Sequence, residues 1–167
     1  MSTYAASIPV FVQMLNSLSA VLDKAEAHAA AKKIAPEVFP TSRLYPDMLP
    51  LTRQVQVACD FASKTTARLT QAEIPTTPDT ETTIADLKAR IAKAVAYVKG
   101  FKPEQFGGAD TREVNFPVGP SATMTLKGEQ YLHNYALPNF YFHVVTAYDI
   151  LRHNGVEIGK RDFLGAA

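Results

Sequence analysis

The stretch that decides the fold is Leu132–Gly155, LHNYALPNFYFHVVTAYDILRHNG. Its second half places apolar side chains at three- and four-residue steps, which is the spacing of one buried helix face (Phe140, Val144, Ala147 and Leu151). Asn154-Gly155 ends that pattern, because glycine readily takes the left-handed conformation that closes a last helical turn. Pro138 has no backbone N–H, so the pattern predicts a helix within 128–154 that is broken or kinked there.

Three other segments have the same helical period. Their apolar faces predict helices over roughly 7–30, 47–69 and 82–99, with Ser7 and Asp47 as N-terminal caps. On the third of these helices the cations form the side that faces solvent (Lys88, Arg90, Lys93 and Lys99). Together with 128–154, these segments predict a bundle of four helices.

Between the third and fourth helices the apolar period changes from helical to alternating. Val114 and Phe116 alternate with polar neighbours, and three more apolar residues do so after the turn at Pro117–Ser121 (Ala122, Met124 and Leu126). We therefore expect a short β-hairpin within 112–126. A lone hairpin is marginal in water, so it must pack on the helices.

The segment 70–82, rich in proline and threonine, is a linker. Its length allows it to cross the whole bundle, since 13 residues at about 3.3 Å each reach about 43 Å and a 20-residue helix is only about 30 Å long. Such a crossing would leave the second and third helices parallel. We expect a single domain over 1–167, because this length suffices to bury a real core.

Composition narrows the class of protein. The net charge of +1 gives no electrostatic reason to expect nucleic acid or an anionic membrane as a partner. The single cysteine, Cys59, excludes an intrachain disulfide, and a reducing compartment is the simpler assumption. The N-terminus lacks the basic region of a signal peptide, and no apolar run approaches the roughly 20 residues that span a bilayer. We expect a cytoplasmic protein.

The run from His143 to Gly155, HVVTAYDILRHNG, resembles the last helix of the DinB/YfiT-like superfamily. The tail 156–165 and the stretch 51–62, LTRQVQVACDFA, resemble a bacterial domain-of-unknown-function branch of that superfamily. This resemblance implies a four-helix bundle with up-down-down-up connectivity. It also implies a divalent metal held by three histidines, one from the second helix and two from the last.

The chain departs from that histidine pattern. His143 matches one ligand, but Asn139 stands one turn earlier, and the second helix offers Gln54, Gln56 and Asp60 instead of a histidine. Amide oxygens are poor ligands for transition metals. We expect the imidazole of His143 to face the second helix without a tightly held three-histidine centre.

Two sets of candidate site residues follow. The candidate ligand-binding residues are His143, Asn139, Gln56, Asp60 and Tyr135. A zinc or nickel ion held weakly would use His143, His133 and Asp60, although ten residues separate the two histidines and place them about 80° apart on a straight helix.

Two classes of function remain open. One is a small-ligand-binding or interaction module with a degenerate metal site, whose partners would be a small molecule and a second copy of the chain. The other is a metal-dependent enzyme, such as a thiol-dependent transferase or hydrolase, that uses His143.

Overall fold

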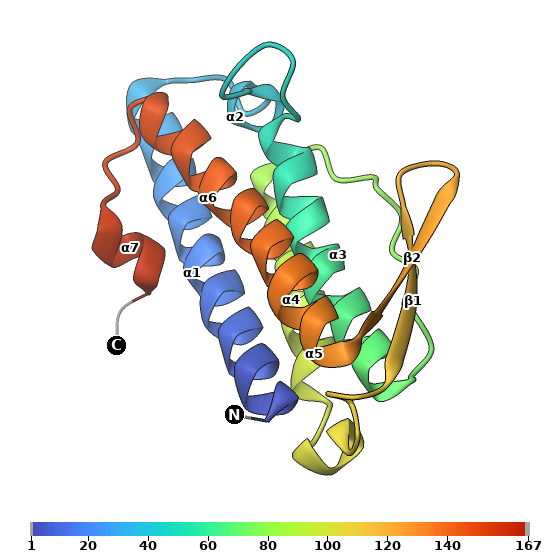
Figure 1. The fold of residues 1–167 in the computed structure, drawn as a ribbon. Helices are drawn as coiled ribbons and strands as arrows, with labels where there is room; N and C mark the ends of the chain where they lie inside the picture. Colours follow the sequence, from blue (N-terminus) through green and yellow to red (C-terminus); the bar gives the residue numbers. More distant parts are fainter. Residues whose placement is uncertain (1, 166–167) are drawn as a thin grey trace.

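Four long helices lie side by side in the computed structural model, which describes residues 2–165 (Figure 1). They are α1 (Thr3–Lys32), α3 (Leu51–Thr70), α4 (Ile84–Lys99) and α6 (Leu137–His153). Helix α1 packs against α4 and α6, and α3 packs against the same two helices, so the four surround one core. The predicted all-α bundle is confirmed.

The apolar stripes read from the sequence form this core. Phe11 of α1 and Phe140 of α6 meet edge to face, with ring centroids 4.9 Å apart and both side chains fully buried. By length and composition α1 is apolar enough to cross a bilayer, so the expectation that no segment reaches this threshold is wrong. In the bundle, 56% of the most apolar stretch of α1 is buried, and the buried side chains of α1 form part of the core.

The connections give the bundle its up-down-down-up order. The hydroxyl of Tyr97, near the end of α4, donates to the carbonyl of Glu73 just after α3 (3.1 Å). The amide of Gln56, near the start of α3, donates to Glu81 just before α4 (2.7 Å). The linker 71–83 therefore runs back along the bundle, as the ribbon shows, and α3 and α4 point the same way (Figure 1).

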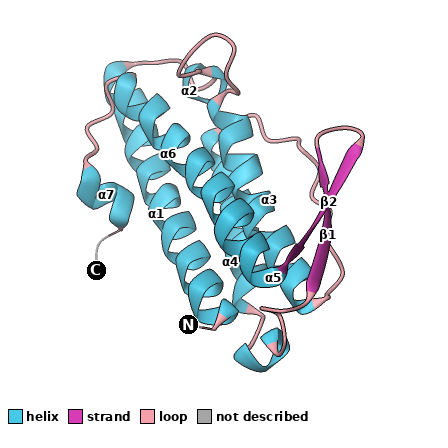
Figure 2. Cartoon of the chain, viewed as in Figure 1, coloured by secondary structure: helices cyan, strands magenta, loops and turns pink. Residues whose placement is uncertain are grey.

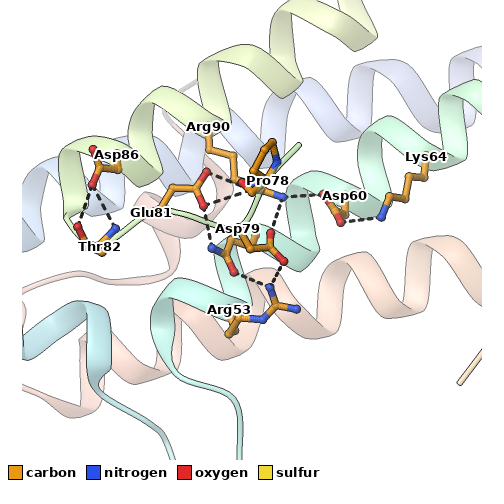
Figure 3. Close-up of polar contacts among 10 residues, drawn as sticks. Arg53, Asp60, Lys64, Pro78, Asp79, Glu81, Thr82, Asp86 and Arg90 are labelled. Carbon is orange, nitrogen blue, oxygen red and sulfur yellow. Dashed lines mark hydrogen bonds and ion pairs between the residues drawn. The ribbon is translucent and has the colours of Figure 1, made fainter. Parts of the chain in front are cut away.

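A buried guanidinium holds this linker in place. The side chain of Arg90 on α4 is only 2% exposed and donates to Asp60 of α3 (2.8 Å) and to Glu81 (3.0 Å) (Figure 3). It also pairs with Asp79 (3.1 Å) and donates to the carbonyl of Pro78 (3.1 Å). The sequence placed Arg90 on the side that faces solvent, and that prediction is wrong. The helical period cannot show that the linker folds over this face.

A second set of contacts attaches the linker to the start of α3. Arg53 forms an ion pair with Asp79 (Figure 3). It also donates to the side-chain oxygen of Gln56 (2.7 Å). Thr83 and Asp86 close a capping box at the start of α4. The linker is thus fixed at its end by hydrogen bonds to both neighbouring helices.

The predicted hairpin lies at one side of the bundle (Figure 2). Strands β1 (Glu113–Val118) and β2 (Ala122–Lys127) pair antiparallel, with Val114 opposite Leu126 and Phe116 opposite Met124. Val114 and Phe116 are buried, so β1 supplies the face that packs on the helices. A side chain at Gly128 would place its Cβ 1.8 Å from the carbonyl oxygen of Ala109, so only glycine fits where the hairpin enters the last helix.

The last helix is interrupted before Pro138. It begins as α5 (Gly128–Tyr131), passes through a π turn at Leu132–Ala136 and continues as α6. Proline cannot donate to the carbonyl four residues earlier, and in the π turn the backbone N–H of Leu137 bonds five residues back, to Leu132. Gly155, with φ of +89°, follows the end of α6 as expected.

Shorter elements complete the chain. They are α2 (Val38–Thr41), the 3₁₀ turn Pro103–Phe106 and α7 (Lys160–Leu164). Lys24 of α1 pairs with Asp162 of α7 (2.6 Å), which fixes the C-terminal turn to the bundle. The predicted caps Ser7 and Asp47 are wrong, because α1 is capped by Ser2 and α3 begins after Pro50. Ser7 is instead buried within α1, where its hydroxyl donates to the carbonyl of Thr3 (2.6 Å).

The burial of Arg90 leads to a prediction about stability. Replacing Arg90 with Met should lower the free energy of unfolding by about 3 kcal/mol, because three carboxylates lose their shared partner. This loss lies at the lower end of the range usual for breaking a buried ion pair, because Asp60 and Asp79 are partly exposed. Urea denaturation would measure the change. Lys93→Met, an exposed site on the same helix, should change it by less than about 0.5 kcal/mol. A loss below about 1 kcal/mol in Arg90→Met would contradict this role.

Candidate functional site

The imidazole of His143 is held by a glutamine of α3. Its Nδ1 lies 2.7 Å from the side-chain oxygen of Gln54, which is buried. The amide nitrogen of Gln54 donates to the carbonyl of Leu49 (3.0 Å). A carbonyl only accepts hydrogen bonds, so the nitrogen end of Gln54 faces Leu49 and its oxygen faces the imidazole. Nδ1 therefore carries the hydrogen, and the lone pair on Nε2 of the neutral ring has no partner among residues 2–165.

The surroundings keep this imidazole neutral. Burial, together with the positive charge of Arg53, lowers the pKa of His143 below its usual value of 6.5. Phe61 stacks against the ring with centroids 6.0 Å apart, and Phe142 meets it edge-on at 5.2 Å. At neutral pH the group is a fixed hydrogen-bond acceptor beside aromatic surface.

Aromatic rings lead from His143 to the hairpin. Phe61 lies 5.9 Å from Tyr135, and Tyr135 lies 4.5 Å from Phe116 of β1, measured between ring centroids. Beside this row is a cavity of about 190 Å³, which we call the α3–hairpin cavity. It is lined by Val57, Asp60, Phe61, Lys64, Arg68, Pro117 and Tyr135.

The structure distributes the predicted ligand-binding residues over two places. Asp60 and Tyr135 line the α3–hairpin cavity, and His143 lies behind the shared ring of Phe61. Asn139 lies one turn from His143, but its amide donates to the carbonyl of Tyr135 (2.7 Å). Gln56 belongs to the linker contacts, where Arg53 and Glu81 occupy its amide.

The predicted metal ligands do not fit a three-ligand centre. His133 is exposed on the π turn, and both oxygens of Asp60 are occupied, one by Arg90 and the other by Lys64 (2.8 Å each). Among residues 2–165, no three histidine, cysteine, aspartate or glutamate side chains gather as a metal site would need. Of this predicted set, only the imidazole of His143 is partly buried and also has a nitrogen without a hydrogen-bond partner among residues 2–165.

Sequence reasoning missed several residues of the cavity. Lys64 and Arg68 follow Asp60 at four-residue steps, so the three side chains share one face of α3. That spacing is visible in the sequence, but the opposing wall is not. Pro117 reaches the cavity from the hairpin, and Tyr135 reaches it from the π turn that precedes α6.

A second cavity, of about 180 Å³, lies between α3, α4 and the linker. It is lined by Cys59, Asp60, Ser63, Pro75, Thr77, Arg90, Lys93, Ala94 and Tyr97. Burial raises the pKa of the Cys59 thiol to about 12. The cysteine is thus a thiol with almost no thiolate at neutral pH, which makes it a poor nucleophile.

Comparisons with known proteins bear on the family. Residues 3–164 match a family described as "Domain of unknown function (DUF1993)". The chain is also similar to a crystal structure of a DinB family member from Shewanella denitrificans. The two share 44% sequence identity with a TM-score of 0.91, over 98% of this chain and 92% of the other. No match was found among curated proteins.

The lowered pKa of His143 predicts a pH dependence. The unfolded chain binds a proton at this residue near pH 6.5, whereas the folded chain resists it. The free energy of unfolding should therefore fall as the pH drops below about 6.5, and His143→Gln should show a shallower fall. Urea denaturation between pH 8 and 5 would measure it. Nitrogen NMR of the imidazole should show the Nδ1–H tautomer, and a pKa above 6.5 would refute the assignment.

Proposed function

The chain belongs to the DUF1993 family, within the DinB-like superfamily of helical bundles, and we propose that it is a small-ligand-binding protein with a degenerate form of the superfamily metal site. The ligand would occupy the α3–hairpin cavity and extend along Phe61 towards His143.

The single observation that carries the proposal is the fixed imidazole. Gln54 occupies Nδ1, and the carbonyl of Leu49 in turn orients Gln54. Nε2 of His143 has no hydrogen bond among residues 2–165. An acceptor held in one orientation loses little freedom when it meets a ligand, which favours binding. The bundle core does not use this lone pair.

The neighbouring cavity has the character of a ligand site. It combines aromatic walls with a few charged groups, as small-molecule sites usually do. At about 190 Å³ it is smaller than the 300–1,000 Å³ typical of drug-sized ligands. The ligand we propose is accordingly a small molecule of one ring or less.

A second candidate function is a metal-dependent enzyme, of the thiol-dependent transferase or hydrolase kind. It is favoured by the support of His143 through Nδ1, because histidines that bind metals are commonly oriented in this way. A zinc or nickel ion could then bind Nε2 weakly. Asp60 and His133 do not complete the ligand set of such an ion, because Asp60 is paired with Arg90 and His133 is exposed.

We propose a cytoplasmic location, with a small molecule as the partner and with neither nucleic acid nor membrane. The proposed homodimer can be tested by sedimentation of the purified chain.

Binding of small molecules tests the main proposal. Amide NMR spectra of the metal-free chain should shift around Phe61, Tyr135 and His143 when a library of single-ring polar compounds is added. His143→Gln should weaken the binding of compounds that donate a hydrogen bond to Nε2 by about 3–10-fold, which corresponds to the free energy of one neutral hydrogen bond. His133→Gln, at an exposed site on the same helix, should leave affinity unchanged.

Two outcomes would decide against this function. A library that shifts no amide near these residues would refute ligand binding. Stoichiometric zinc or nickel that survives dialysis of untagged protein, and is lost in His143→Ala, would favour the enzyme instead.

A further inference from the structure

One cation in the α3–hairpin cavity has no acidic partner. Lys64 pairs with Asp60, Arg53 pairs with Asp79, and Arg90 is surrounded by carboxylates. Arg68 forms no ion pair among residues 2–165 and only donates from Nη1 to the hydroxyl of Tyr131 (3.1 Å). Its charge is therefore left for a group outside the described chain.

The hydrogen bonds of Arg68 are also incomplete. Its Nε is shielded from solvent and has no hydrogen-bond partner. Its Nη2 has no partner among residues 2–165 either, yet it is not shielded as Nε is. Because Nη1 is partly occupied and Nε is covered, Nη2 is the part of the guanidinium that a ligand in the cavity can reach.

The position of this guanidinium is fixed before any ligand arrives. It lies 6.0 Å from the ring centroids of both Phe116 and Tyr131. The hydroxyl of Tyr131 is held in turn by Thr65 at 3.3 Å. A cation packed on two rings and hydrogen-bonded at one end loses little freedom on binding.

The neighbouring carboxylate cannot neutralise Arg68. Both oxygens of Asp60 are occupied, by Arg90 and by Lys64. Asp79 and Glu81 lie in the linker contacts, where Arg53 and Arg90 pair with them. The cavity thus keeps an excess of one positive charge, which matches a ligand with one negative charge.

We infer that the α3–hairpin cavity binds a small organic monocarboxylate, with its carboxylate on Arg68 and its flat apolar body against Phe61 and Tyr135. This inference rests on the proposed function and specifies its ligand class. A carboxylate suits the guanidinium because the two form charge-assisted hydrogen bonds. The apolar body suits a cavity whose other walls include Val57 and Pro117.

Benzoate, benzamide and inorganic phosphate test this inference as probes. Benzamide has the shape of benzoate without its charge, and phosphate has charge without an apolar body. Amide NMR titrations of the full chain would give a dissociation constant for each probe. In the wild type, benzoate should bind at least tenfold more tightly than either benzamide or phosphate.

Substitutions of Arg68 test whether its positive charge binds the carboxylate. Arg68→Met, which keeps much of the side-chain length, should weaken benzoate at least tenfold and leave benzamide unchanged. Arg68→Lys, which keeps the charge without the fork, should weaken benzoate less than Arg68→Met does. The matched control is Arg152→Met, which removes the same charge from an exposed site on α6 and should leave benzoate affinity within twofold. Circular dichroism and Tm establish whether each variant is folded. If Arg68→Met does not fold, benzoate binding by Arg68→Lys tests whether Arg68 binds the carboxylate.

The outcomes separate this inference from the proposed function. The inference that the ligand is a carboxylate bound by Arg68 is wrong if benzamide and benzoate bind equally well. It is also wrong if both Arg68 variants bind benzoate as tightly as the wild type. In either case the proposal of a ligand-binding protein remains. If phosphate binds as tightly as benzoate and Arg68→Met abolishes phosphate binding, the inference that the ligand has an organic body is wrong. If no probe shifts the amides of the cavity, and the library of single-ring polar compounds also shifts none, both proposals fail.

Discussion

The charge of Arg90 is the constraint on which the rest of the structure depends. A guanidinium that is almost fully buried must be paired, because an isolated charge in a protein interior is strongly unfavourable. Its partners come from α3 and from the linker, so pairing it draws three separate segments together. The linker is thereby held along the bundle, and this course is what makes α3 and α4 parallel.

The same pairing shapes the site on the other side of α3. Asp60 uses one oxygen for Arg90 and the other for Lys64, so it has no oxygen left for a metal or for Arg68. Asp60, which the sequence suggested as a ligand for a weakly held metal ion, thus stabilises the fold instead. Both the lack of an acidic partner for Arg68 among residues 2–165 and the unavailability of Asp60 as a metal ligand are consistent with this arrangement of ion pairs.

The likeness to the DinB family member in Shewanella denitrificans concerns the fold and the sequence over nearly the whole chain. A shared bundle does not fix chemistry, since function depends on the side chains that a site presents. In this chain the imidazole of His143 keeps the support of Gln54, while the other donors are exposed or occupied. On this combination we propose recognition of a small molecule in place of retention of an ion.

The sequence by itself determined the helices, their order and the hairpin, because these depend on residues close together in the chain. The period around Phe140 and Val144 marked the last helix, and Pro138 marked the interruption in its hydrogen bonding. Only the tertiary structure decided which polar groups are buried and which are free. The spacing of residues alone places Arg90 on the polar side of its helix. In the folded chain, however, the linker covers that side and buries Arg90. Gln54 and Arg68 are two ordinary polar residues of one helix until α6 and the hairpin approach. Partners distant in sequence then give one of them a role in orienting His143, and leave the other with an unpaired charge.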